Sequence, residues 1–297
     1  TGGLVLARTD KIEMRSEELY VSAAEIRVRY VFRNTSGEAV TTLVAFPMPD
    51  IVFQVQQTVE IPSPESENFL DFQTAVDGVP VKANVERHVF SAGIDRTPLL
   101  QGLGIPLMPF DERTSAALAA LPPATFASLA EVGLVRTEGM MNGRPYVMPG
   151  DWTLKTTYFW TQSFPAGRDV VIEHRYRPSV GMNNMPQMTD HPRDRWQVAA
   201  SETARRKYCA DPAFLAAASR KPGEYDELWI TYVLGTGANW AGPIGEFTLT
   251  IDTGSPENRL AVCERDLQRT GPTTFRARRK DYRPDGNLEI LILKRMR

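Results

Sequence analysis

Alternation of apolar and polar side chains is clearest near the middle of the chain, over residues 170–177. The two faces of this segment differ in character, with Val170, Ile172, His174 and Tyr176 on one side and Val171, Glu173, Arg175 and Arg177 on the other. A period of two with one mostly apolar side predicts a β-strand that is buried on one face. A partner strand is expected over 152–164, joined by the turn Phe164-Pro165-Ala166-Gly167. Because a hairpin cannot bury its apolar face alone, other strands must cover it.

The same period recurs on both sides of this predicted hairpin. Apolar residues alternate with charged or polar ones in 26–33 and again in 247–251. The dipeptide Asp77-Gly78, between two strand-like segments, is a strong signal for a hairpin turn. The pattern therefore predicts a mainly β protein, built as an antiparallel β-sandwich.

The segment 91–150 interrupts this pattern with helical signals. Asp111 fits the N-cap position of one helix, and a pair of prolines suits the start of another, which Gly133 would end. The last part, 139–150, contains glycine and proline and predicts a loop. We therefore expect 91–150 to be a helical insertion.

A short helical segment is also expected in the C-terminal half, at about 199–220, where Asp211-Pro212 resembles a cap followed by proline. These observations predict three parts. Residues 1–90 together with 151–181 form the sandwich, 91–150 is the helical insertion, and 182–297 holds a methionine-rich loop, the helical segment and strands that pack on or extend the sandwich.

Charge excludes some classes of partner. The 297 residues carry a formal net charge of −2, which gives no general electrostatic case for binding nucleic acid or anionic lipid. The tail 264–297 is an exception, with ten Lys or Arg against five Asp or Glu, and its densest run is Phe275–Lys280. A solvated strand face or a charged edge that resists aggregation is the favoured interpretation of this run, and a binding patch is the alternative.

No apolar run approaches the roughly 18–20 residues that span a bilayer as a helix, so no transmembrane segment is expected. The chain begins at Thr1 without a basic and apolar leader. This start is typical of an exported product from which the signal peptide has been removed.

The two cysteines, Cys209 and Cys263, fit no zinc or redox motif. Taken alone they are either two lone thiols or one disulfide, which would indicate an oxidising compartment.

Two family resemblances add to this picture. The stretch RVRYVFRNTSGEAVTTLVAFPMPDIVFQVQQTVE, then AVDGVPVKANVERHVF and later FPAGRDVVIEHRYRPSVG, resembles the VIT domain (vault and inter-alpha-trypsin type). That resemblance implies a β-sandwich interaction module without catalytic residues over 1–90 and 151–181.

The blocks EHRYRPSVG, KYCADPAF, TGANWAGPIGEFTLTID and GPTTFRARRKDYRPDGNLEILIL are similar to those of a family of exported proteobacterial proteins, which is known only as a domain of unknown function. This resemblance implies a disulfide between Cys209 and Cys263 and a periplasmic location. It implies no activity, ligand or catalytic residue.

The usual catalytic signatures are missing, among them GxSxG, HExxH and the P-loop. His174 is the candidate for a catalytic base, which would need a carboxylate across the sheet to orient it. The alternative is a buried histidine with satisfied hydrogen bonds. We expect His88, near a strand end, to lie at the surface.

The spacing of Met182, Met185, Met188 and His191 suggests a metal site, because thioethers and imidazole suit Cu(I). Against it, the prolines in this loop prevent a helix that would align the four side chains, and methionine also serves as packing.

Trp240, with Asn239 beside it, is a candidate stacking platform for a ligand in a glycine-rich turn. The alternative is a tryptophan that folds back and holds its own loop.

Together these features favour a non-catalytic periplasmic binding or assembly module that requires no cofactor. Its expected partner is another periplasmic or envelope protein, with no role for nucleic acid. A periplasmic copper-binding protein is the first alternative, and a hydrolase with an unrecognised site is the second.

Overall fold

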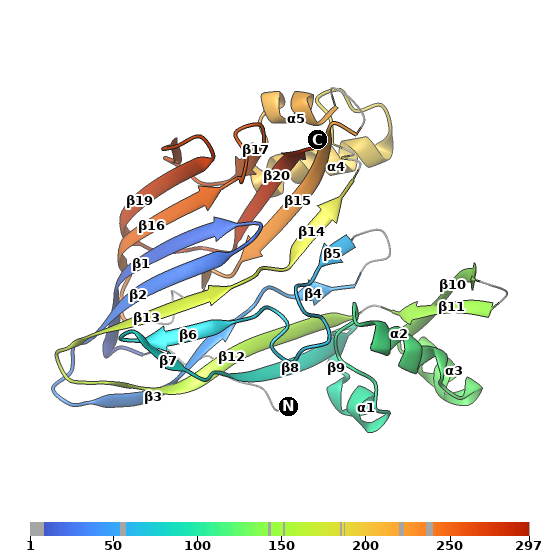
Figure 1. Cartoon of the computed structure of the whole chain (residues 1–297), viewed down its shortest axis with the longest axis horizontal. Coiled ribbons are helices and arrows are strands. Elements are labelled where there is room, and N and C mark those ends of the chain that lie inside the picture. The colour runs from blue at the N-terminus through green and yellow to red at the C-terminus, as the bar shows by residue number, and fades with distance from the viewer. Residues whose placement is uncertain are drawn as a thin grey trace.

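The computed structural model describes residues 9–53, 58–141, 144–150, 152–184, 186, 188–219, 223–235 and 240–296. The molecule is mainly β, as predicted, and its largest sheet has eight strands (Figure 1). In spatial order this sheet A consists of β18 (Gln268–Arg269), β19 (Thr274–Tyr282), β16 (Ile244–Asp252), β1 (Ile12–Ser22), β2 (Ile26–Asn34), β13 (Asp169–Tyr176), β6 (Gln73–Val76) and β7 (Val79–Val81). Neighbouring strands are antiparallel except β1 and β16, which run parallel.

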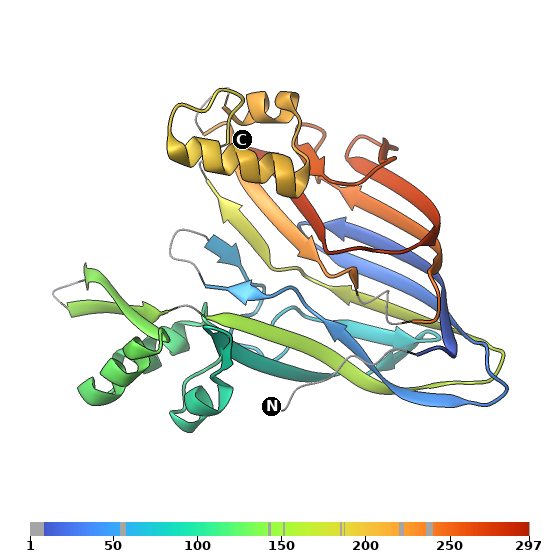
Figure 2. The ribbon, with the colours of Figure 1, turned by 180° about the vertical axis from the view of Figure 1, so that it is seen from behind.

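Two five-stranded sheets pack against the inner face of sheet A (Figure 2). Sheet B consists of β3 (Val40–Pro47), β12 (Thr153–Phe164), β8 (Asn84–Ser91) and β9 (Ile94–Asp95), with β4 (Ile51–Val52) beside β12. Sheet C consists of β17 (Arg259–Val262), β20 (Leu288–Arg295), β15 (Tyr225–Tyr232), β14 (Val180–Asn183) and β5 (Thr58–Glu60).

Aromatic side chains fill the core between these layers. Phe46 of sheet B lies 4.7 Å from the His174 ring of sheet A, measured between centroids, and the hydroxyls of Tyr30 in sheet A and Tyr232 in sheet C are 2.9 Å apart. One continuous cluster of buried residues takes members from all three predicted parts of the chain, including Leu100 of the insertion. The strands are therefore held mainly by burial of apolar surface in one shared core.

The central hairpin predicted from the sequence does not form. Strands β12 and β13 are joined by the expected turn, but β12 pairs with β3 and β8 in sheet B, whereas β13 pairs with β2 and β6 in sheet A. Their apolar faces meet across the core instead, with Trp160 of β12 5.4 Å from His174 of β13. The alternation identified each strand correctly but could not show which strand pairs with it, because a sandwich and a hairpin need the same buried face.

A β-bulge in β1 decides which of its side chains face the core. The register of β1 against β2 shifts around Arg15, which has no Cα partner on β2. After the shift, odd-numbered residues face inward, so Glu17 is buried and Glu18 is exposed. The bulge brings the Arg15 carbonyl against Gly245 of β16, where a Cβ would lie only 2.7 Å from that oxygen. Only glycine allows this approach without displacing backbone.

The segment 91–150 holds three helices, α1 (Thr97–Gly102), α2 (Glu112–Ala119) and α3 (Pro123–Glu131). The Asp111 side chain caps α2 by accepting a hydrogen bond from the Arg113 amide, as predicted. The expected loop at 139–150 is wrong, because β10 (Val135–Met141) and β11 (Arg144–Pro149) form a hairpin beside these helices (Figure 1). Within the described residues, no helix is long and apolar enough to cross a bilayer.

A second, smaller core lies where α4 (Arg195–Tyr208) and α5 (Pro212–Ser219) cover sheet C (Figure 2). Asp211 caps α5 through the Phe214 amide, as its position suggested. The predicted disulfide is present and joins Cys209, at the end of α4, to Cys263, just after β17. It therefore ties the helical segment to the C-terminal strands.

Candidate functional site

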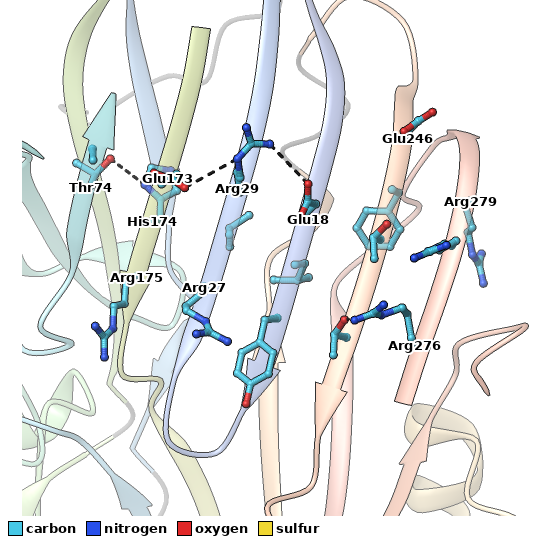
Figure 3. Close-up of a pocket in the computed structure, with 18 of the residues that line it drawn as sticks. Glu18, Arg27, Arg29, Thr74, Glu173, His174, Arg175, Glu246, Arg276 and Arg279 are labelled. Carbon is cyan, nitrogen blue, oxygen red and sulfur yellow. Dashed lines mark hydrogen bonds and ion pairs between the residues drawn. The ribbon is translucent and has the colours of Figure 1, made fainter. Parts of the chain in front are cut away.

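The outer face of sheet A carries a broad pocket of about 1080 Å³, which reaches from β19 across β16, β1, β2 and β13 to β6 and β7 (Figure 3). Cationic side chains outnumber carboxylates along its lining, with Arg27, Arg29, Arg175, Arg276, Arg278, Arg279 and Lys280 against Glu18, Glu173 and Glu246. Residues from β1 and from β19, at opposite ends of the chain, meet here because β16 lies between those two strands.

Strand register arranges these side chains in rows that run across the strands. We name the first the arginine row, and following Cα partners from strand to strand it consists of Arg276, Thr250, Tyr20, Arg27, Arg175 and Gln73. This row contains arginines at three positions and no carboxylate. Since neighbouring strands lie about 4.8 Å apart, the row spans about 24 Å.

The neighbouring row has a different charge pattern. It consists of Arg278, Thr248, Glu18, Arg29, Glu173 and Ala75. Arg29 lies between two carboxylates, 3.5 Å from Glu18 and 3.9 Å from Glu173, as the dashed lines in Figure 3 show. Cross-strand pairs of opposite charge stabilise a sheet, and this row is largely neutralised by its own ion pairs.

In the arginine row, two like charges are direct neighbours, because Arg27 of β2 and Arg175 of β13 are Cα partners. Glu25, in the turn before β2, holds both guanidinium groups, at 3.0 Å from Arg27 and 2.6 Å from Arg175. The Arg27 guanidinium also lies 4.2 Å from the centre of the Tyr20 ring. These contacts offset the repulsion and orient both arginines before any ligand arrives.

On the β19 side of the pocket most of the cationic side chains are exposed and have fewer ionic partners. Arg276 donates a hydrogen bond from Nε to the Thr250 hydroxyl, 3.3 Å away. Arg278 and Lys280 are exposed, and across the part of the chain that the structure describes neither forms an ion pair. The Cα partner of Lys280 is Glu246, so a carboxylate is near without being in contact. This strand therefore offers positive charge to an incoming group.

The inner face of the same sheet keeps His174 away from solvent. Although His174 borders the pocket, its ring packs among core aromatic rings, and its Nδ1 lies 2.9 Å from the Thr74 hydroxyl. Burial lowers the pKa of His174 to about 3, so the imidazole is neutral at neutral pH. Its partner is a hydroxyl rather than the carboxylate that orients a catalytic base. The arrangement matches the buried-histidine alternative.

Glu17, on β1, is a buried carboxyl group in the same core, with 2% of its surface exposed. Burial raises its pKa to about 8, and the Tyr232 hydroxyl donates to it at 3.4 Å. Glu17 is therefore protonated at neutral pH, and the core avoids an unpaired negative charge.

The residues proposed for copper lie in different environments. Met182 packs against the main core, Met188 is buried in the second core, and the His191 side chain is 91% exposed beside Asp190. Met185 lies outside the described residues. A copper site remains a prediction, and the positions of the other three residues give it no support.

Trp240 and His88 do not line the pocket. Trp240 is half-buried and packs on Phe32, with 4.4 Å between ring centroids, which matches the folded-back alternative rather than an exposed platform. Asn239 lies outside the described residues. His88 is partly exposed and bonds to Asp95 at 2.9 Å.

Sequence reasoning missed the pocket, although part of its signal was visible. The run Phe275–Lys280 was noted for its charge, and every second residue of it, Arg276, Arg278 and Lys280, lies on the pocket face of β19. The pairing of β19 with β16, and of β16 with β1, left no signal in the sequence.

Fold and site together define a mainly β protein with a cation-rich pocket on one sheet face. The chain belongs to the family of the domain of unknown function DUF4424, whose model matches residues 1–291. No curated protein matches the chain. A solved structure from Legionella pneumophila subsp. pneumophila str. Philadelphia 1, provisionally described as a nutrient binding protein, is 16% identical, and the alignment covers 97% of this chain and 68% of that one with a TM-score of 0.49. The VIT-like segment and the division into three parts stay predictions.

Proposed function

We propose that this chain is a non-catalytic binding module, that its ligand site is the pocket on the outer face of sheet A, and that its ligand is anionic. The supporting observation is the excess of cationic side chains in the pocket, two of which, Arg278 and Lys280, form no ion pair among the described residues. An anion would gain attraction there without breaking an existing pair.

The proposed location is the periplasm. The disulfide between Cys209 and Cys263 supports it, because such bonds persist in oxidising compartments. The expected envelope protein partner stays a prediction. The hydrolase alternative finds no support at His174, whose ring faces the core.

A charge-matched comparison tests the proposal. In the triple variant R276Q/R278Q/K280Q we expect the affinity for dextran sulfate, measured by isothermal titration calorimetry, to fall about a thousandfold, because each of the three lost contacts to a charged group is worth about one decade. The control R33Q/R193Q/R259Q removes the same charge from positions outside the pocket and should retain binding. Equal weakening in both variants would show that net charge alone attracts the probe, and the pocket would be rejected as the site.

A further inference from the structure

The charges in the pocket are separated by positions that carry hydroxyl groups. In the arginine row, Arg276 stands at one end and the pair Arg27 and Arg175 toward the other, with Thr250 and Tyr20 between them. From β19 to β2 there are three strand spacings, or about 14 Å. An elongated ligand lying across the strands can contact both groups of arginines and the hydroxyl groups between them.

We propose that the arginine row binds a linear acidic oligosaccharide, with acid groups at the two arginine ends and sugar hydroxyls over the middle. This inference rests on the proposed function and narrows its ligand class.

The middle of the row is suited to hydroxyl groups. The Tyr20 hydroxyl donates to Asp252 at 3.0 Å and keeps its oxygen lone pairs as acceptors, and Thr250 accepts from Arg276 while its own hydroxyl hydrogen stays available. Beside them, the Glu18 carboxylate in the next row can accept from sugar hydroxyls. A ligand that alternates acid groups with hydroxyls complements this mixture.

The carboxylates disfavour a ligand with continuous negative charge. Glu18, Glu173 and Glu246 line the same pocket, so a polyanion that carries a charge at every unit should bind less tightly per charge than a ligand whose charges are spaced. Spacing between the ligand's charges allows the arginine ends to be occupied while these carboxylates face hydroxyls.

An acidic peptide fits less well than a sugar. The strands that form the pocket floor from β16 to β13 pair with a neighbour on each side, and β18 covers Phe275 and Arg276 of β19, so within the described residues the sheet offers free backbone groups to a peptide mainly along the rest of the β19 edge. A peptide lying across the strands would leave its amides to water, whereas an oligosaccharide is recognised through side chains alone.

The site is also preorganised at one end. Glu25 holds the Arg27 and Arg175 guanidinium groups 3.0 and 2.6 Å from its oxygens, and its side chain is only 21% exposed. Because these arginines are already oriented, their side chains lose less conformational freedom when a ligand acid group binds beside them.

Calorimetric titration with four probes tests the ligand class. The probes are a hyaluronan hexasaccharide, which carries a carboxylate on every second sugar, a phosphorylated oligomannose, neutral maltohexaose and a hexaglutamate peptide. We expect one or both acidic sugars to bind, the neutral sugar not to bind, and the peptide to bind at least about tenfold more weakly than the better acidic sugar, which corresponds to one decade of affinity. Binding of only one acidic sugar would identify the acid group as carboxylate or phosphate.

Two variants locate the binding. R27Q/R276Q should weaken the acidic sugar about a hundredfold, one decade for each lost charged contact. R33Q/R259Q, which alters arginines outside the pocket, should change it less than about twofold. Stronger binding of the peptide with the same sensitivity to R27Q/R276Q would reject the sugar and leave the proposed function standing. Failure of every anionic probe, dextran sulfate included, would reject both.

Discussion

Consecutive residues that lie on opposite faces of sheet A differ in burial and in protonation state. Glu17 and Glu18 are consecutive on β1, yet Glu17 is buried and protonated while the Glu18 side chain is 61% exposed and paired with Arg29. The same contrast holds on β13 between His174, neutral in the core, and Glu173, which borders the pocket. Whether these side chains are charged depends on the face of the sheet they occupy. The inner face lacks the water that stabilises an ion, so ionisable groups there are neutral.

The two faces of sheet A also differ in what they contribute to the protein. The inner face supplies stability through aromatic packing and neutral hydrogen bonds, and the outer face carries charged groups that a ligand can reach. Substitutions on the two faces should therefore have separable effects, on folding and on binding.

The largest expected effect separates the faces at adjacent positions of β13. His174→Ala should lower the free energy of unfolding by about 3 kcal/mol, because it leaves a cavity among aromatic rings and removes the partner of Thr74. Glu173→Ala should change it by less than about 0.5 kcal/mol. Urea denaturation of both variants measures the difference, and equal losses would contradict the distinction between the faces.

The bulge that sets the two faces of β1 provides a second test. Gly245→Ala would place a Cβ 2.7 Å from the Arg15 carbonyl oxygen, and since backbone on both strands must move, we expect a loss of about 2 to 3 kcal/mol. Gly37→Ala is the matched control, because nothing lies within 4 Å of its Cβ position. If thermal unfolding finds both variants as stable as the parent, the glycine is not needed for the bulge.

The dependence of stability on pH sharpens the comparison at Glu17. Its pKa is about 8 in the folded chain against an ordinary 4.5, so between these values the folded state holds a proton that the unfolded state has lost, and stability falls as pH rises. His174 acts oppositely, with a pKa of about 3 against 6.5, and costs stability as pH falls through that range. Above pH 6.5 the effect of Glu17 is therefore no longer offset by His174.

From pH 6.5 to 8 the free energy of unfolding of the parent chain should fall by about 2 kcal/mol more than that of Glu17→Gln, which cannot titrate. Chemical denaturation at a series of pH values measures this difference. Parallel curves for the two proteins would mean that Glu17 is ionised in the folded state.

Much of the local structure was predictable from the sequence. Alternation identified β2 and β13 and correctly gave their buried faces, and Asp111 and Asp211 mark the helix starts they were expected to mark. These features depend on residues close together in the chain, where period and capping chemistry act directly.

The sequence by itself determined which residues alternate, which helices are capped and that the chain would bury its strands in a mainly β core. Only the tertiary structure decided that β12 and β13 enter different sheets, that a bulge at Arg15 turns Glu18 and not Glu17 toward the pocket, and that Arg276 and Arg27 share one row. The physical reason is that the pairing of distant strands depends on how all apolar faces are buried at once, which no local pattern records.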